Sequence, residues 1–105
     1  MGQVADAPEF LHPTVDEIEL PVVLHALSDP QRLRVVRELA ASEEALACGS
    51  FALDIAKSTR THHFRVLREA GIIEQRREGT RKLSVLRRAD LDARFPGLLE
   101  AVLSA

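Results

Sequence analysis

The residues of this chain best suited to chemistry begin at position 57, where basic and hydrogen-bonding side chains recur at helical spacing opposite an apolar face. An arginine can bond bidentately to a guanine edge, and hydroxyl groups can bond to bases or phosphates. The alternative is a solvated basic face with no base-reading role. Thr61 also fits the register of the apolar face, with Phe64, Leu67 and Ala70. We therefore predict contact with double-stranded DNA through Lys57, Ser58, Thr59, Arg60, Thr61, His62 and Arg65.

A basic hairpin is predicted directly after this helix. Strands are expected near 72–77 and 81–86, with a turn at 78–80. Four cations bracket the turn: Arg76, Arg77, Arg81 and Lys82. Such a hairpin can place cations on phosphates or in the minor groove, although charges on an edge hairpin also prevent aggregation. A helix able to fill a major groove, followed by a basic hairpin, is the layout of a winged helix-turn-helix.

The distribution of charge supports this prediction although the net charge of the chain is −2. Residues 57–88 hold ten Lys and Arg against three acids, a net charge of +7. The remainder holds four basic and thirteen acidic residues, a net charge of −9. A duplex would meet the basic segment, and the acidic remainder would discourage non-specific binding.

The elements that must position these residues are those of a mainly α (α+β) fold, with about five helices and a two-stranded β-hairpin wing. We expect a flexible arm over residues 1–13 and one DNA-binding and dimerisation domain over 14–105. Thr14 and Glu17 form a capping-box pattern that predicts a helix to about Ala26, with Pro21 as a break or kink. Asp29 and Pro30 predict a second helix start.

Further along, Gly71 is expected to end the basic helix, and residues 89–105 are helical in pattern with a restart at Pro96. The stretch 43–56 is a short helix or an irregular turn that packs on the core. The side chains expected to point inward from the first two helices are Val15, Ile18, Val22, Leu27, Leu33, Val36 and Leu39, with Arg32, Arg34 and Arg37 facing out.

Composition bounds the class of protein. At 105 residues the chain is one domain with a modest core, and it has no apolar run long enough to span a bilayer and no evident signal peptide. The single cysteine, Cys48, excludes an intrachain disulfide and fits a reducing cytoplasm. We expect a cytoplasmic protein without a membrane partner, in which Cys48 is a buried structural residue rather than a reactive thiolate.

Two segments resemble the ArsR/SmtB-type winged-helix repressors. STRTHHFRVLREAGIIEQRREGTRKLSVLR is similar to the recognition helix and wing of that family, and LHALSDPQRLRVVRELA to its second-helix region. The resemblance covers about residues 20–88. It implies a winged-helix homodimer paired through its first and last helices. It also implies repression of metal, metalloid or stress genes at an operator, which a two-fold dimer would bind as an inverted repeat.

The chain departs from the family pattern at two places. Ala56 stands where the family often has a Ser that caps the recognition helix, so the cap is expected from Asp54 instead. The best-known effector ligands are also absent. Only Cys48 lies where one family site has paired cysteines, and the last helix carries carboxylates but no His.

An effector could therefore control this protein in two ways. His12 and His25 lie on different elements, and a dimer could bring them near carboxylates of the partner to bind Ni or Zn. Unrelated surface or packing histidines are the alternative. His62 and His63 point about 100° apart on a helix, so they do not easily chelate one metal. The second way is through a separate partner protein that carries the effector site.

Other classes of function have less support. The chain has no phosphate-cradling glycine loop, HExxH motif or nucleophile elbow, so we do not expect an enzyme. The competing class is a winged-helix interaction module that uses the same basic surface to dock an acidic partner protein.

Overall fold

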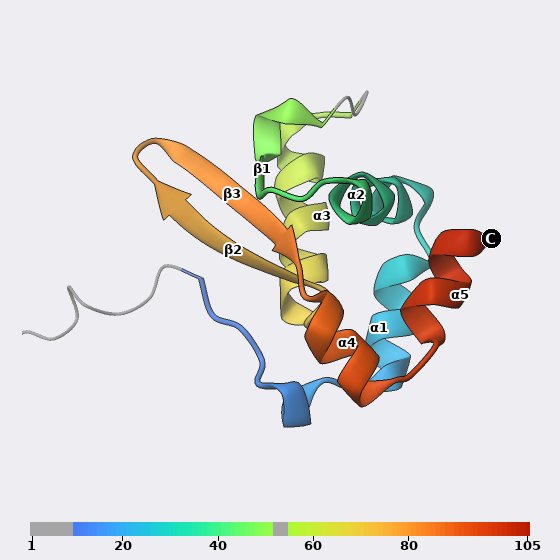
Figure 1. Cartoon of the computed structure of the whole chain (residues 1–105). Helices are drawn as coiled ribbons and strands as arrows, with labels where there is room; N and C mark the ends of the chain where they lie inside the picture. The colour runs from blue at the N-terminus through green and yellow to red at the C-terminus, as the bar shows by residue number, and fades with distance from the viewer. Residues whose placement is uncertain (1–9, 52–54) are drawn as a thin grey trace, which may run out of the picture.

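The computed structural model describes residues 10–51 and 55–105. In this part of the chain five α-helices pack together beside a small antiparallel sheet, and two of its strands project away from them as a hairpin (Figure 1). This arrangement confirms the predicted winged-helix class. The helices are α1 (Leu20–Leu27), α2 (Pro30–Ala41), α3 (Lys57–Glu69), α4 (Arg88–Arg94) and α5 (Leu98–Ser104); the strands are β1 (Leu46–Ala47), β2 (Ile73–Glu78) and β3 (Arg81–Leu86); and the 3₁₀ turns are η2 (Val15–Glu17) and η3 (Cys48–Ser50).

The sheet has three strands in the order β1-β3-β2, one more than the hairpin predicted. β1 pairs Leu46 with Ser84, and it lies in the stretch interpreted as a short helix or an irregular turn. Two residues are too few for an alternating pattern, so the sequence gives no signal for this pairing. Phe51 is buried as expected and stacks edge-on against Phe64 with ring centroids 5.3 Å apart. Leu53 of the same stretch lies outside the described residues.

The N-terminal helix begins later than the capping pattern predicts. Thr14 N–H does donate to Glu17 Oε1 at 2.8 Å, but this bond closes only the η2 turn. Ile18 is extended, and Pro21 lies in the first turn of α1, where its missing N–H costs nothing. Because the helix starts at Leu20, the predicted inward face is wrong at Val22, which is 45% exposed. Ile18 is buried as predicted, and within α1 the buried residues are Val23 and Ala26.

The start of α2 is as predicted, but one of its arginines is not. Asp29 caps the helix by accepting from the N–H of Gln31 at 2.8 Å and of Arg32 at 3.2 Å. Arg32 was expected to face solvent and is 7% exposed. It is buried because its guanidinium Nε donates to the carbonyl of Ala26 at 2.7 Å, across the turn from α1.

The basic helix α3 begins at Lys57 and is closed by Gly71, which has φ +85°. Its N-cap is Ala56, whose side chain makes no capping bond, and Asp54 lies outside the described residues. The predicted apolar face is wrong at Thr61, which is exposed. Three positions along a helix turn by about 300°, so Thr61 lies to one side of the core-facing line. The buried side chains of this line are His63, Phe64, Leu67 and Ala70.

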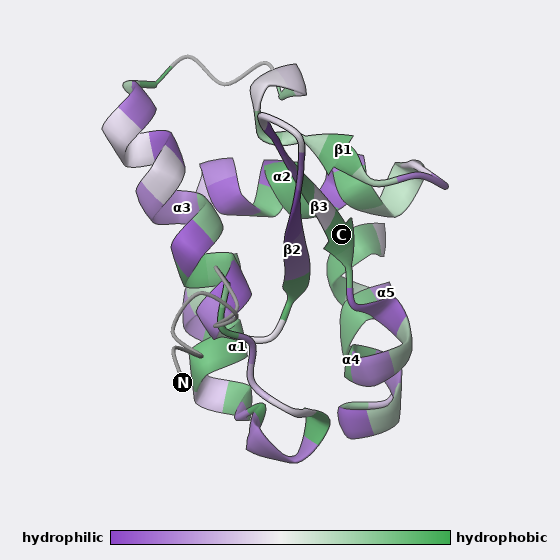
Figure 2. Ribbon diagram, turned by 90° about the vertical axis from the view of Figure 1, so that its left-hand side faces the viewer, coloured by the Kyte–Doolittle hydropathy of each residue, from purple (hydrophilic) through white to green (hydrophobic). Residues whose placement is uncertain are grey.

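The last two helices, α4 and α5, complete the hydrophobic core. α4 and α5 are separated at Pro96 and Gly97, and Leu99 of α5 is buried while Leu98 and Leu103 pack against the core. Figure 2 shows apolar colouring concentrated in α1, and hydrophilic colouring along much of α3 and β2. Hydrophilic residues therefore dominate the predicted DNA-contacting helix and the wing, and the other helices carry them in alternation with apolar ones.

Candidate nucleic-acid interface

The outward face of α3 carries the predicted helix residues. Each of them is exposed except Arg60, which is half-buried: Lys57, Ser58, Thr59, Thr61, His62 and Arg65 are open to solvent. The inward face packs on α1 and α2, so the helix is supported by the rest of the domain. A firmly packed helix with a polar outer face can enter a groove without rearrangement.

The wing presents its four predicted cations on two faces. In an antiparallel pair, residues directly opposite lie on the same face. Arg77 lies opposite Lys82, and Gln75 lies opposite Ser84 two residues along, so these four side chains share one face of the hairpin. Arg76 and Arg81 belong to the other face. Arg76, Arg77 and Arg81 are exposed, and Lys82 is half-buried.

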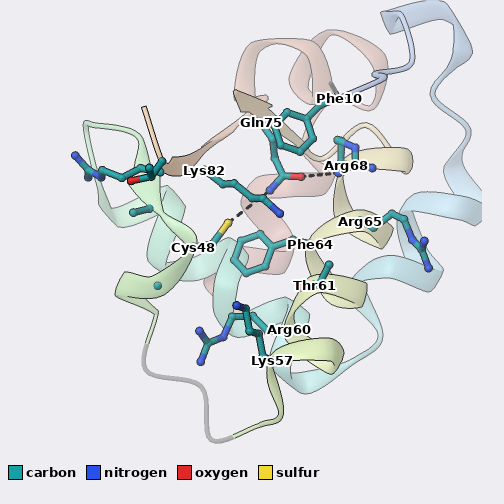
Figure 3. Close-up of a pocket in the computed structure, with 14 residues that line it drawn as sticks. Phe10, Cys48, Lys57, Arg60, Thr61, Phe64, Arg65, Arg68, Gln75 and Lys82 are labelled. Carbon is teal, nitrogen blue, oxygen red and sulfur yellow. Dashed lines mark hydrogen bonds between the residues drawn. The ribbon is translucent and has the colours of Figure 1, made fainter. Parts of the chain in front are cut away.

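The helix and the wing enclose a cavity of about 520 Å³ (Figure 3). Six of the eleven predicted DNA-contacting residues line it, and Ser58, Thr59, His62, Arg76 and Arg77 do not. The described residues that line the cavity include no carboxylate, so its surface is positive. The lining residues are Phe10, Ala47, Cys48, Gly49, Lys57, Arg60, Thr61, Phe64, Arg65, Arg68, Gln75, Thr80, Arg81 and Lys82.

A polar network that the sequence analysis missed holds the wing against α3. Arg68 Nη1 donates to Gln75 Oε1 at 2.8 Å, and Gln75 Nε2 donates to Ser84 Oγ at 3.2 Å. Gln75 is 4% exposed and Ser84 is fully buried. The alternation of β2 places Gln75 on the inner face with Ile73, but a glutamine there gives no apolar signal.

Cys48 lies at the edge of this network. Gln75 Nε2 donates to Cys48 Sγ at 3.7 Å, and the sulfur is half-buried. Burial raises the pKa of the Cys48 thiol, which disfavours the thiolate at neutral pH. The sulfur therefore contributes an apolar, neutral atom to an otherwise basic cavity.

The two adjacent histidines of α3 have different surroundings. His62, one of the predicted DNA-contacting residues, is exposed, whereas His63 is 7% exposed. Arg32 Nη1 lies 3.2 Å from His63 Nδ1, and a guanidinium can only donate, so Nδ1 is the acceptor. Burial and the neighbouring Arg32 charge lower the pKa of His63, so the neutral ring is favoured.

The predicted metal ligands lie on separate elements. His12 Nε2 accepts from the backbone N–H of Gln75 at 3.0 Å, and His25 is exposed on α1. Burial lowers the pKa of His12. Among residues 10–51 and 55–105, no three His, Cys, Asp or Glu side chains group together as a metal site would require. A site shared between two subunits stays a prediction.

No helix in the described ranges is both long enough and apolar enough to cross a bilayer.

Comparison with known proteins gives the same assignment for the family. A model described as a helix-turn-helix domain matches residues 27–76. The HTH-type transcriptional regulator YceK of Bacillus subtilis (strain 168) is 37% identical over 82 residues, which cover 76% of this chain and 82% of that protein.

Solved structures of transcriptional regulators have a similar fold. The transcriptional repressor BigR from Xylella fastidiosa aligns with a TM-score of 0.62 at 29% identity, over 80% of this chain and 82% of that one. An ArsR-like transcriptional regulator from Rhodococcus sp. RHA1 aligns with a TM-score of 0.59 at 22% identity, over 70% of each chain, and shows the likeness of the fold. With its basic recognition helix, its wing and these relatives, the chain belongs to the ArsR-type helix-turn-helix transcriptional regulators, a family of DNA-binding proteins rather than enzymes.

Proposed function

We propose that this regulator is a homodimeric repressor that binds an inverted-repeat operator. The observation that carries the proposal is the convergence of α3 and the wing, from which six predicted DNA-contacting side chains surround one surface that has no carboxylate among its described lining residues. The exposed face of α3 would enter a major groove, with Arg60 and Arg65 as candidates for base contacts. The wing cations would neutralise phosphates or enter the minor groove.

An exposed apolar surface on α1, at the end of the molecule opposite the wing, supports the proposed dimer. Leu20 and Leu24 of α1 are 40% and 46% exposed, and because they lie four residues apart on the helix they form one exposed apolar surface. α1 and α5 both lie at the end opposite the wing (Figure 1). Two copies that cover this apolar surface would present two recognition helices to grooves about one turn, roughly 34 Å, apart.

The proposal of repression is supported by a similar protein, and the proposal of metal control by two histidines. BigR is described as a transcriptional repressor, and it shares most of its length with this chain. Control has two versions, direct sensing of Ni or Zn through His12 and His25, or a partner protein with the effector site. Because His12 Nε2 already accepts a hydrogen bond from Gln75, a metal would have to use Nδ1 or displace that bond. This contact favours the partner-protein version.

Electrophoretic mobility shift on the chain's own upstream DNA tests the proposal. We expect a specific shift that Arg65→Ala weakens by about 10- to 100-fold, the loss expected for one bidentate base contact. Arg34→Ala is the matched control, since Arg34 is exposed on α2, pairs with Glu38 of the same helix and does not line the cavity. Equal affinity for the two variants would remove Arg65 from the reading surface.

Two additions to the same experiment distinguish direct metal sensing from control through a partner protein. A shift that changes with Ni, Zn or a chelator supports direct sensing, and a shift indifferent to metal supports a partner. If plain duplex DNA does not bind at physiological salt, the surface instead docks an acidic partner protein, and the repressor proposal fails.

A further inference from the structure

We infer that the cavity between α3 and the wing binds a small organic anion with a flat apolar body, and that this anion and DNA exclude each other. The inference rests on the proposed DNA-binding function, because the cavity lies beneath the same surface. It names a third source of control, distinct from a metal at His12 and His25 and from a partner protein.

The cavity has the size and the chemistry of a small-molecule site. Its volume of about 520 Å³ lies within the usual range for ligand pockets, roughly 300–1,000 Å³. Figure 3 shows Phe64 near the centre of the cavity, with Cys48 on one side, Lys57 and Arg60 at one end, and Arg68 and Phe10 towards the other. The cavity therefore combines apolar atoms with cations.

The charge of the lining favours an anion. Six cations line the cavity, and the described lining residues include no carboxylate. The lining cations are Lys57, Arg60, Arg65, Arg68, Arg81 and Lys82. Guanidinium groups bind carboxylates and sulfonates through charge-assisted hydrogen bonds. The uncompensated positive charge therefore points to an anionic ligand.

The apolar part of the lining explains the flat apolar body. Phe10, Ala47 and Cys48 line the cavity together with the cations. Phe64 lies between Arg60 and Arg68 along α3 but is only 3% exposed, so it closes the cavity from the core side. An acidic group on Arg68 would leave the rest of the ligand beside Phe10, which an inorganic anion would leave uncovered.

At the end of the cavity formed by Arg68, a DNA phosphate is a poorer occupant than a small organic anion. Arg68 belongs to the last turn of α3, about 16 Å from Lys57 by helical rise, whereas groove readers contact bases from the first turns. The ring of Phe10 also covers Arg68, with the guanidinium carbon 5.2 Å from its centroid. A ligand in the cavity would neutralise Arg60 and Lys57, which the proposed DNA contact requires.

Nitrogen-15 NMR of the arginine Nε–Hε groups tests the site directly on the full chain, with anilinonaphthalene sulfonate as the probe. We expect the Arg60 and Arg68 signals to move during the titration. The Arg87 and Arg94 signals should stay, because their Nε atoms already donate to Asp90 and to the carbonyl of Ile18, both at 2.9 Å. Movement of all four signals alike, or of neither Arg60 nor Arg68, would overturn the inference.

Three controls distinguish an organic-anion site from other kinds of binding. Neutral phenylnaphthylamine that moves the same signals equally would mean an apolar site only. Inorganic phosphate that moves them at the same concentration would mean a site for nucleic-acid phosphates. Loss of probe binding in a Leu20→Ser, Leu24→Ser variant would place the probe on the exposed face of α1. Each of these three results would overturn the inference.

Competition between the probe and DNA tests mutual exclusion. We expect Arg68→Gln to weaken probe binding about tenfold, with Arg34→Gln as the control. Because the bond from Arg68 to Gln75 also holds the wing against α3, the competition with DNA is measured on the wild type. Saturating probe should release operator DNA from the wild type; simultaneous binding would overturn mutual exclusion. If no DNA binds at all, the proposed function fails, while the arginine signals still decide the cavity.

Discussion

Arg32 joins three helices through one guanidinium. Its Nε donates to Ala26 O at 2.7 Å and its Nη2 to His25 O at 3.3 Å, both carbonyls at the end of α1. Its Nη1 donates to His63 of α3. The last carbonyls of a helix have no partner within the helix, so this arginine from α2 satisfies the carbonyl of the buried Ala26, whereas His25 O also accepts from the N–H and Oγ of Ser28.

Arg32→Met should therefore destabilise the protein strongly. The variant leaves the Ala26 carbonyl and His63 Nδ1 without their donor, and we expect a loss of about 2–4 kcal/mol in the free energy of unfolding. Urea unfolding followed by circular dichroism measures it. Arg34→Met is the matched control, expected within about 0.5 kcal/mol because its pair with Glu38 is exposed. Similar losses in the two variants would contradict the role of Arg32.

His63 should make the stability depend on pH. Burial lowers the pKa of His63 in the folded protein below its ordinary value of 6.5. As the pH falls through that value, the unfolded chain therefore takes up the proton before the folded protein does. The contribution of the neutral ring is complete above about pH 6.5 and is lost as the pH falls below it.

The measurement is urea unfolding at about pH 7.5 and about pH 5.5. We expect the wild type to lose more stability on acidification than His63→Gln, which keeps an acceptor for Arg32 and does not titrate. His12, whose pKa is also lowered by burial, adds a loss of the same sign in both proteins. An identical pH dependence of the two proteins would show that the pKa of His63 does not differ between the folded and unfolded states.

At the level of the elements, Gly71 determines how the wing leaves α3. Gly71 N–H donates to Arg68 O and Ile72 N–H donates to Leu67 O, both at 3.0 Å, which is a Schellman closure of the helix. Its φ of +85° suits glycine, and an added Cβ would lie 2.5 Å from Ile18 Cγ1. The turn is therefore restricted by both conformation and space.

Gly97 provides a matched comparison for this restriction. It has the same φ of +85°, but a Cβ there would meet nothing within 4 Å. We expect Gly97→Ala to cost about 1–2 kcal/mol for the left-handed backbone alone. Gly71→Ala should cost at least about 2 kcal/mol more, because Ile18 must move within the core. Thermal or urea unfolding of the two variants measures the difference, and equal losses would contradict the steric argument.

Across the whole molecule, polar and apolar surfaces lie at opposite ends. The cations of α3 and the wing surround one end, and the exposed leucines of α1 lie at the other. An apolar patch at the end opposite a DNA-contacting surface can pair two copies without covering that surface.

Leu24→Glu should therefore separate the two copies. Leu24 is 46% exposed, so a glutamate there is tolerated in one copy, whereas in a dimer it would be buried without a partner. Analytical ultracentrifugation should show a shift from dimer to monomer, with weaker operator binding. Leu11→Glu is the control, since Leu11 is 72% exposed and lies outside α1. A monomeric wild type would contradict the dimer.

Local signals in the chain predicted α2, α3 and the hairpin because their physical causes act within a few residues. Asp29 caps its helix through the N–H groups two and three residues ahead, and Gly71 closes α3 through its own conformation. Ten cations between 57 and 88 also predicted the basic surface, since charge is additive along the chain. The family resemblance rested on the same segments.

Tertiary structure alone decided which polar side chains are buried and what they enclose. Arg32 meets His63 across 31 positions, and Gln75 meets Cys48 across 27, so no local pattern marks either residue as buried. Hydrophobic periodicity scores apolar character, and it places an arginine or a glutamine outside wherever it stands. The cavity lies between α3 and the wing, whose relative position depends on the bond from Arg68 to Gln75 and on the pairing of β3 with β1, and these partners become known only when the chain is folded.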